Sequence, residues 1–173
     1  VPNRDTRWHQ SIDSMLAFID AGSQASADLR ALIEDAPRDC YAASDQIELL
    51  APIPRPRQNV ICLGLNYKDH VVETASDQEI KLPRSPVVFT KAANSVNGPY
   101  ADIEIDTSVS AKMDWEVELA VIIGKTGMNI PERDAMEYVF GYTVLNDVTA
   151  RDRQKWHKQF YIGKSYKGSC PMG

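Results

Sequence analysis

The sequence has no long apolar stretch. No uninterrupted apolar run approaches the roughly 18 residues that a membrane-spanning helix needs, and no signal-peptide pattern opens the chain. Cysteine is also scarce. Cys40, Cys62 and Cys170 are widely spaced and form no CxxC pair, which gives no support for a zinc site or a disulfide framework. We therefore expect a protein with no membrane partner, and a reducing cytoplasmic location as the default.

A concentrated basic surface is missing as well. The chain carries 19 lysines and arginines against 24 aspartates and glutamates, for a formal net charge of -5. Its densest basic stretch, 151–158, is interrupted by Asp152, by amide groups and by aromatic side chains. Because phosphate binding normally needs clustered positive charge, the sequence argues against a nucleic-acid partner. The length of 173 residues suffices for one domain with a sizeable core.

Residues 1–45 are predicted to be a small helical segment, because apolar side chains recur there with the spacing of one helix face. The first group is Ile12, Met15, Leu16 and Ile19, and the second group, after Gly22, is Leu29, Leu32 and Ile33. Pro37 then ends the helical pattern. No residue of this segment suggests chemistry.

Residues 46–173 are predicted to form a β-rich domain, because short apolar runs are separated by prolines and glycines. The proline-dense stretch 51–57 is expected to be an extended connector. Short helices are predicted to start near Asn66 and to run from Pro131 to about Val139. Strands are predicted at Val60–Leu63, Pro86–Lys91, Ile103–Ile105, Trp115–Gly124 and Phe140–Asp147. The expected class is α+β and β-rich.

The segment 114–124 holds the most informative pattern. Side chains alternate between the two faces of a strand, so one face carries only apolar residues and should be core. That face is Val117, Leu119, Val121 and Ile123. Glu116 and Glu118 share the other face, with Cα atoms roughly 7 Å apart, close enough for both carboxylates to reach one cation. The alternative is a half-exposed strand whose charged side faces water.

Three further positions are chemical candidates, each with an ordinary structural alternative. Asp147 follows an apolar strand where the chain turns, a common place for a functional carboxylate and also for a local cap. His70 and Glu73 are i, i+3 neighbours on the short predicted helix and suit a general base, or they are a simple surface pair. Lys164 follows Gly163, where close backbone approach lets a lysine meet an anion, although most lysines are surface residues.

Five motifs occur together in an order that resembles the fumarylacetoacetate hydrolase family. They are GLNYKDHVVE, PVVFTKAANSVNGP, DWEVELAVIIGK, GYTVLNDVTARDRQ and GKSYKGSCPMG, and the resemblance runs from about Leu49 to the last residue. It implies a mixed β-sandwich roll with short helices, commonly assembled as a homodimer. The HxxE form of the first motif is similar to the smaller subgroup, which includes acylpyruvases, fumarylpyruvate hydrolases and oxaloacetate decarboxylases. The extra aspartate ligand of the larger animal-type fumarylacetoacetases has no counterpart here.

The resemblance implies one divalent cation held by Glu116, Glu118 and Asp147, with Mg²⁺ as the first expectation and Mn²⁺ or Ca²⁺ as alternatives. All-oxygen ligation fits such hard cations. In the same way, His70 and Glu73 resemble a catalytic dyad that activates water. The resemblance places three more groups with the catalytic Lys164 in a polar wall that binds the substrate. These groups are Arg151, Gln154 and, more loosely, Lys91.

Three functions remain open at this point. The first is a metal-dependent hydrolase that cleaves a C–C bond in a small diketo acid, such as an acylpyruvate or a fumarylpyruvate. The second is a lyase that decarboxylates oxaloacetate or a related 2-oxo acid, in which His70 only handles protons. The third is an inert metal- and ligand-binding homologue. The family domain normally continues beyond the segment matched here, so we expect a part of a larger domain with unpaired strands and exposed apolar surface.

Overall fold

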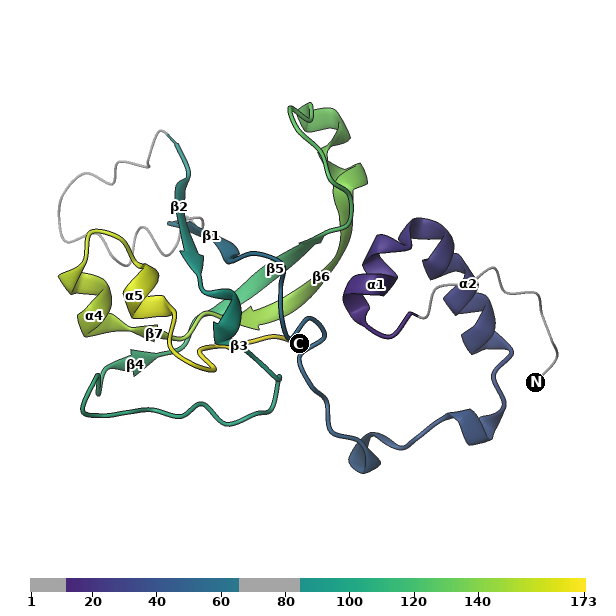
Figure 1. Cartoon of the computed structure of the whole chain (residues 1–173), viewed down its shortest axis with the longest axis horizontal. Coiled ribbons are helices and arrows are strands. Elements are labelled where there is room, and N and C mark those ends of the chain that lie inside the picture. The colour runs from purple at the N-terminus through teal and green to yellow at the C-terminus, as the bar shows by residue number, and fades with distance from the viewer. Residues whose placement is uncertain (1–11, 66–84) are drawn as a thin grey trace.

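The computed structural model describes residues 12–65 and 85–173 (Figure 1). His70, Glu73 and the helix predicted to start near Asn66 lie outside the described residues. Helices and strands are both short, which confirms the mixed, β-rich class predicted from the sequence. Within the two described ranges, no helix has the length and apolar character needed to cross a membrane.

The N-terminal segment is helical as predicted and packs onto the strands. α1 (Met15–Asp20) starts at Ser14, whose Oγ accepts a hydrogen bond from the Ala17 amide at 3.2 Å. α2 (Gly22–Glu34) follows directly, and two 3-10 turns, η1 (Arg38–Cys40) and η2 (Ser44–Gln46), lead to the connector. Ile19 of α1 is buried in the core, and the Phe18 ring meets the Phe140 ring edge-on. The second predicted apolar group, by contrast, lies exposed on α2.

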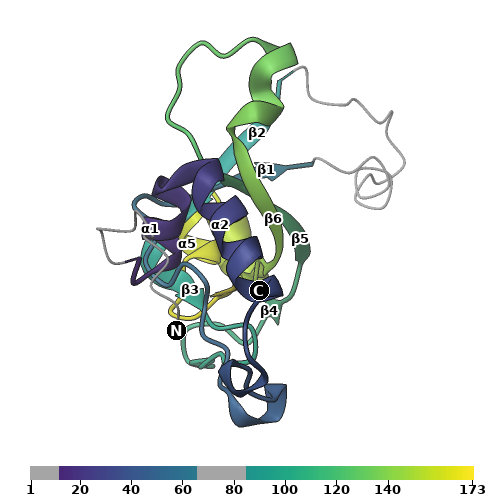
Figure 2. The same cartoon turned by 90° about the vertical axis from the view of Figure 1, so that its right-hand side faces the viewer.

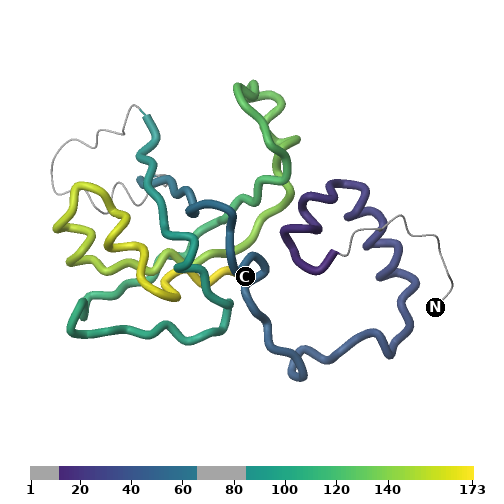
Figure 3. The backbone as a smooth tube through the Cα atoms, viewed as in Figure 1, coloured from purple at the N-terminus to yellow at the C-terminus, as the bar shows by residue number. Residues whose placement is uncertain are grey.

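The strands that the structure describes pair into four two-stranded sheets. β1 (Val60–Gly64) pairs antiparallel with β2 (Val87–Lys91), and β5 (Val117–Ile123) with β6 (Val139–Asn146). The short strands β4 (Met113–Asp114) and β7 (Thr149–Ala150) are also antiparallel, whereas β3 (Val96–Asn97) and β8 (Cys170–Pro171) are parallel. The tube in Figure 3 shows how β8 brings the C-terminal end beside β6 near the centre of the molecule.

Two predicted elements differ from the observed ones. Ile103–Ile105 is not a strand but part of the long loop between β3 and β4. A hydrogen bond from the Asn97 side chain to the Asp102 carbonyl and a turn at Asp106 fold this loop back locally. The helix predicted after Pro131 is the 3-10 helix η4 (Glu132–Tyr138), which lies at the tip of the β5–β6 hairpin (Figure 2).

The assignment of the two β5 faces was wrong. Ala120 and Ile122 pack against the core, whereas Val117 and Leu119 are 67% and 62% exposed. The alternating pattern separates the two faces correctly but does not state which one is covered. The face with the buried Leu145 of β6 is the covered one. Its core cluster consists of Ile19, Ile53, Leu145, Cys170 and Met172.

Two short helices complete the described structure. α4 (Arg151–Trp156) begins directly after β7, and α5 (Tyr161–Lys164) packs against it. The contact is close at Gly163, where an added Cβ would lie 2.6 Å from the Gln154 backbone nitrogen. This confirms the prediction that the glycine permits close backbone approach. It also places Lys164 and Gln154 on neighbouring elements (Figure 1).

Candidate functional site

Backbone pairing brings Glu116 and Asp147 together. Val117 of β5 lies opposite Asn146 of β6, so Glu116 and Asp147 are the next residues beyond that pair. The Asp147 amide donates to the Glu116 carbonyl at 2.8 Å, and the Glu116 amide donates to Asn146 Oδ1 at 3.2 Å. The strand register therefore fixes two of the three predicted ligand carboxylates side by side.

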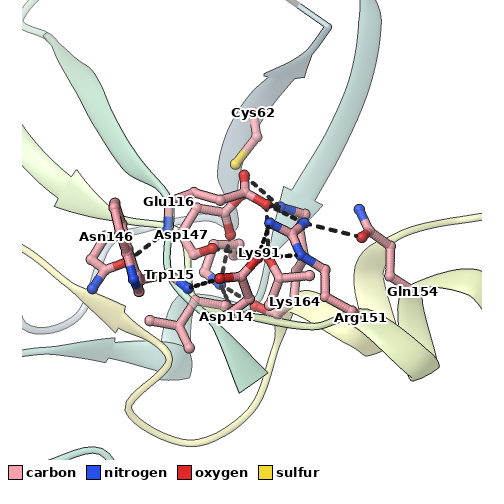
Figure 4. Close-up of polar contacts among 12 residues, drawn as sticks. Cys62, Lys91, Asp114, Trp115, Glu116, Asn146, Asp147, Arg151, Gln154 and Lys164 are labelled. Atoms are coloured by element: carbon pink, nitrogen blue, oxygen red, sulfur yellow. Dashed lines mark hydrogen bonds and ion pairs between the residues drawn. The ribbon is translucent and has the colours of Figure 1, made fainter. Parts of the chain in front are cut away.

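Lys164 joins these two carboxylates. It ends α5 and is 2% exposed. Its ammonium lies 3.1 Å from both Glu116 carboxylate oxygens and forms an ion pair with Asp147 Oδ2 (Figure 4). The ring of Phe89 lies 4.8 Å from the same ammonium, a distance typical of a cation–π contact. Lys164 thus bridges two acids in a site that is largely closed to water.

Lys91 holds the opposite side of Asp147. At the end of β2 it is fully buried, and its ammonium lies 2.9 Å from Asp147 Oδ1. It also donates to the Val148 carbonyl at 3.1 Å, to the Lys164 carbonyl, and to Ser169 Oγ at 3.4 Å. An ammonium has three N–H donors, so these protein acceptors saturate it. The predicted contact of Lys91 with a substrate stays a prediction, since all of these partners are protein atoms.

Arg151 and Gln154 line the same site from α4. The Arg151 guanidinium lies 2.6 Å from Glu116 Oε1 and 2.8 Å from Asp114 Oδ2, and it donates to Gln154 Oε1 at 3.3 Å. Burial acts to lower the pKa of Arg151, but the hydrogen bond to Asp114 and the charge of Glu116 outweigh it, so the pKa is raised. The guanidinium is therefore permanently charged and tied to two carboxylates.

Glu118, the third predicted ligand, belongs to β5 itself. It lies opposite Leu145, on the inner face of β5, one strand repeat beyond Glu116. In the described ranges no group of three histidines, cysteines or acids gathers closely enough to hold a metal ion. Two of the three predicted ligands therefore converge, and their predicted role as metal ligands stays a prediction.

Three polar residues of the cluster were not predicted from the sequence. Asp114 binds Arg151, Thr149 Oγ1 donates to Glu116 Oε1 at 3.2 Å, and Ser169 contacts Lys91. A sequence pattern could have identified the first two, since Asp114 lies one strand repeat before Glu116 and Thr149 lies in the same turn as Asp147. No sequence pattern identifies Ser169, because its position depends on the packing of the C-terminal segment.

The donor set fits a hard divalent cation in its chemistry. Both converging groups are carboxylates, and both already bind one shared cationic group, the Lys164 ammonium. Asp147 Oδ1 is buried and, apart from its ion pair with Lys91, accepts no hydrogen bond from any residue that the structure describes. Oxygen-only ligands of this kind suit Mg²⁺, Mn²⁺ or Ca²⁺ and do not distinguish among them.

Comparison with known proteins identifies the family. Residues 59–173 match the family described as Fumarylacetoacetate (FAA) hydrolase C-terminal, so the chain belongs to this family. The solved structure of a fumarylacetoacetate hydrolase from the psychrophile Exiguobacterium antarcticum is similar over 93% of this chain and 53% of its own. Its TM-score is 0.74 and its sequence identity 45%. The likeness confirms the fold that the motifs predicted.

Curated relatives show which members of this family the chain is similar to. Over 167 residues the chain is 46% identical to oxaloacetate tautomerase YisK of Bacillus subtilis, covering 92% of this chain and 54% of that protein. It is 42% identical over 162 residues to the mitochondrial oxaloacetate tautomerase Fahd2a of Rattus norvegicus, covering 92% of this chain and 49% of that protein. The chain spans about half the length of these curated relatives. It is thus similar to members of an enzyme family whose enzymes commonly use a divalent metal.

Proposed function

We propose that the protein catalyses keto–enol tautomerisation of oxaloacetate or a closely related 2-oxo acid with the help of a divalent cation. The observation that carries this proposal is the 46% identity to an oxaloacetate tautomerase over 92% of the chain. The comparisons support the oxaloacetate alternative of the sequence analysis better than the C–C hydrolase of diketo acids. The relatives' names indicate a tautomerisation, a proton transfer in which no C–C bond is broken and no water molecule is consumed.

The reaction moves one proton and one electron pair. In the ketonisation direction the enol O–H bond at C2 breaks and the C2 oxygen becomes a carbonyl. The electron pair of the C2–C3 double bond accepts a proton at C3. The transient enolate carries negative charge, which positively charged groups stabilise. Lys164 and Arg151 are the cations of the described cluster that we assign to substrate oxygens, with Gln154 as a neutral partner.

Glu116, Glu118 and Asp147 would hold the cation. When bound, it would supply Lewis-acid stabilisation of the substrate's C2 oxygen. The neighbouring lysines and arginine balance the negative charge of Glu116 and Asp147, so the two carboxylates can lie close together in a largely buried site. Following the family resemblance, we assign proton handling to His70 with Glu73, which lie outside the described residues.

The experiment is the decay of the oxaloacetate enol absorbance with the protein, with Mg²⁺ or Mn²⁺ and then with chelator. We expect ketonisation to be accelerated with metal and to stop on chelation. Glu116→Gln should lower the rate about a hundredfold, since a ligand and the partner of two cations is lost. Glu104→Gln is the matched control, because Glu104 is 79% exposed and pairs only with the exposed Lys167 among the described residues.

Other outcomes would change the assignment. Release of CO₂ from oxaloacetate without faster ketonisation would support the decarboxylase, and loss of acylpyruvate enol absorbance would support the hydrolase. No turnover of any of these acids, with metal bound, would support an inert homologue. We also propose a homodimer and a cytoplasmic location, as the sequence suggested. Light scattering of the purified protein tests the first of these.

A further inference from the structure

The ammonium of Lys164 uses the oxygens that a bound cation would need. It lies 3.1 Å from both oxygens of Glu116 and pairs with Asp147 Oδ2. A divalent ion binds carboxylate oxygens at about 2.0–2.6 Å. Two positive charges on the same oxygens would repel each other in this largely buried site. A divalent cation bound by Glu116 and Asp147 would therefore compete with the Lys164 ammonium for these oxygens.

We propose that Lys164 is a displaceable counter-cation. It holds Glu116 and Asp147 together until a divalent cation binds, and its ammonium is then released toward the substrate. This inference rests on the proposed function and adds a regulation of the same site. Lys164 becomes available to substrate oxygens only after the metal is in place, so metal loading precedes productive substrate binding.

The two buried lysines differ in the way this role requires. Lys91 and Lys164 hold opposite oxygens of Asp147, Oδ1 and Oδ2. Lys91 is anchored by two backbone carbonyls and by Ser169, none of which a cation would claim. The acceptors of the Lys164 ammonium are carboxylate oxygens of Glu116 and Asp147, both predicted metal ligands. Cation binding thus competes for the carboxylate acceptors of Lys164, whereas Lys91 keeps two backbone carbonyls and Ser169 even if Asp147 Oδ1 binds the cation.

Lys164 also has a path to move along. It is the last residue of α5 and carries a flexible four-carbon side chain. The carboxylate of Glu116, to which it binds, is 24% exposed, and the neighbouring Arg151 is 32% exposed. The ammonium can therefore shift toward the open side of Glu116, where Arg151 and Gln154 are also located.

The first test measures the affinity for Mn²⁺ by electron paramagnetic resonance of the protein, without substrate. Lys164→Gln should bind Mn²⁺ roughly tenfold or more tightly than the wild type, because one competing charge is gone. Lys167→Gln is the control for the same change in net charge, since Lys167 is 83% exposed. It should leave the affinity unchanged. Unchanged or weaker Mn²⁺ binding by Lys164→Gln would overturn the inference.

The second test needs no variant and so does not depend on the folding of Lys164→Gln. Lysine acylation of the wild type is mapped by mass spectrometry after chelator treatment and again with saturating Mg²⁺. Lys164 should react more than twofold faster with Mg²⁺, while Lys91 stays protected in both samples. Equal reactivity of Lys164 with and without Mg²⁺ would contradict displacement. A wild type that binds no Mn²⁺ would instead refute the metal-dependent function itself, and the inference with it.

Discussion

At the scale of single residues, two thiols share the surroundings of the charged cluster. Cys62 is partly buried in β1, and Cys170 is fully buried in β8. Burial and the charge of Asp147 raise the pKa of Cys62 to about 12. Burial raises the pKa of Cys170 to about 11, although the positive charge of Lys91 opposes the shift. Both thiols are therefore protonated at neutral pH and unsuited to nucleophilic chemistry.

These raised pKa values predict selective alkylation. With iodoacetamide at pH 8, the exposed Cys40 should be modified at least tenfold faster than Cys62 and Cys170 in the folded protein. In urea all three should react alike, which is the control. Peptide mapping by mass spectrometry measures the modification. Fast modification of Cys62 in the folded protein would show that its side chain is not buried and that its pKa is not raised.

The same shifts set a direction for stability at alkaline pH. An unfolded chain releases its thiol protons near pH 8.5, whereas the folded chain holds them to about 11–12. The folded state therefore binds more protons in this window, and the free energy of unfolding falls as pH rises through it. Below about pH 8.5 the stabilising contribution of both thiols is complete.

The sequence motifs predicted most of the residues that meet in the cluster. Glu116, Asp147, Arg151 and Lys164 stand at fixed places in their motifs, so the resemblance located them. That Lys91 and Lys164 take opposite oxygens of Asp147 was not predictable. These contacts depend on the packing of β2 and α5 around the β6–β7 turn, and no local pattern encodes that packing.

At the scale of elements, the contact between α4 and α5 positions two of the site residues. An alanine Cβ at position 163 would lie 2.6 Å from the backbone nitrogen of Gln154 and 2.8 Å from its Cα. Backbone atoms cannot rotate away, so α5 would have to shift and would carry Lys164 with it.

The strand pattern predicted β5 and β6 well, but it did not identify which face of β5 is covered, because both faces carry aliphatic residues.

Gly163→Ala should therefore lower the free energy of unfolding by about 1–2 kcal/mol, because overpacking outweighs the better helix propensity of alanine. Urea unfolding measures the change, and Mn²⁺ affinity reports the displaced Lys164. The matched control is Gly141→Ala in β6, where an added Cβ meets no atom within 4 Å. Equal effects of the two substitutions would contradict the close contact between α4 and α5.

At the scale of the whole molecule, one small core joins the N-terminal helices to the strands. Ile19 from α1 packs with Ile53, Leu145, Cys170 and Met172. The separate helical segment predicted for residues 1–45 thus contributes to the same core as the β-rich part. The outer face of β5 and β6 remains exposed, with Leu119 at 62% and Val144 at 60%. Periodicity predicted the elements, and their shared core arises from long-range packing that periodicity does not report.

This arrangement predicts unequal losses of stability from two leucine truncations. Leu145→Ala should lower the free energy of unfolding by about 2–5 kcal/mol, because Leu145 is 4% exposed and its loss leaves a cavity. Leu119→Ala should change it by less than about 0.5 kcal/mol, because the side chain is mostly in water. Urea unfolding of the two variants compares them directly. A larger loss for Leu119→Ala would mean that the outer face of β5 is covered in the folded protein.

The buried pair of Lys91 and Asp147 also limits how this protein can evolve. Loss of Asp147 alone leaves the Lys91 ammonium in the interior without a carboxylate, at a cost of about 3–5 kcal/mol, whereas loss of both residues is far milder. An ancestral lineage could therefore lose the aspartate only together with the lysine. Across descendants, we expect the two positions to covary, and any descendant that lost the aspartate through disuse of the site should soon have lost the lysine too.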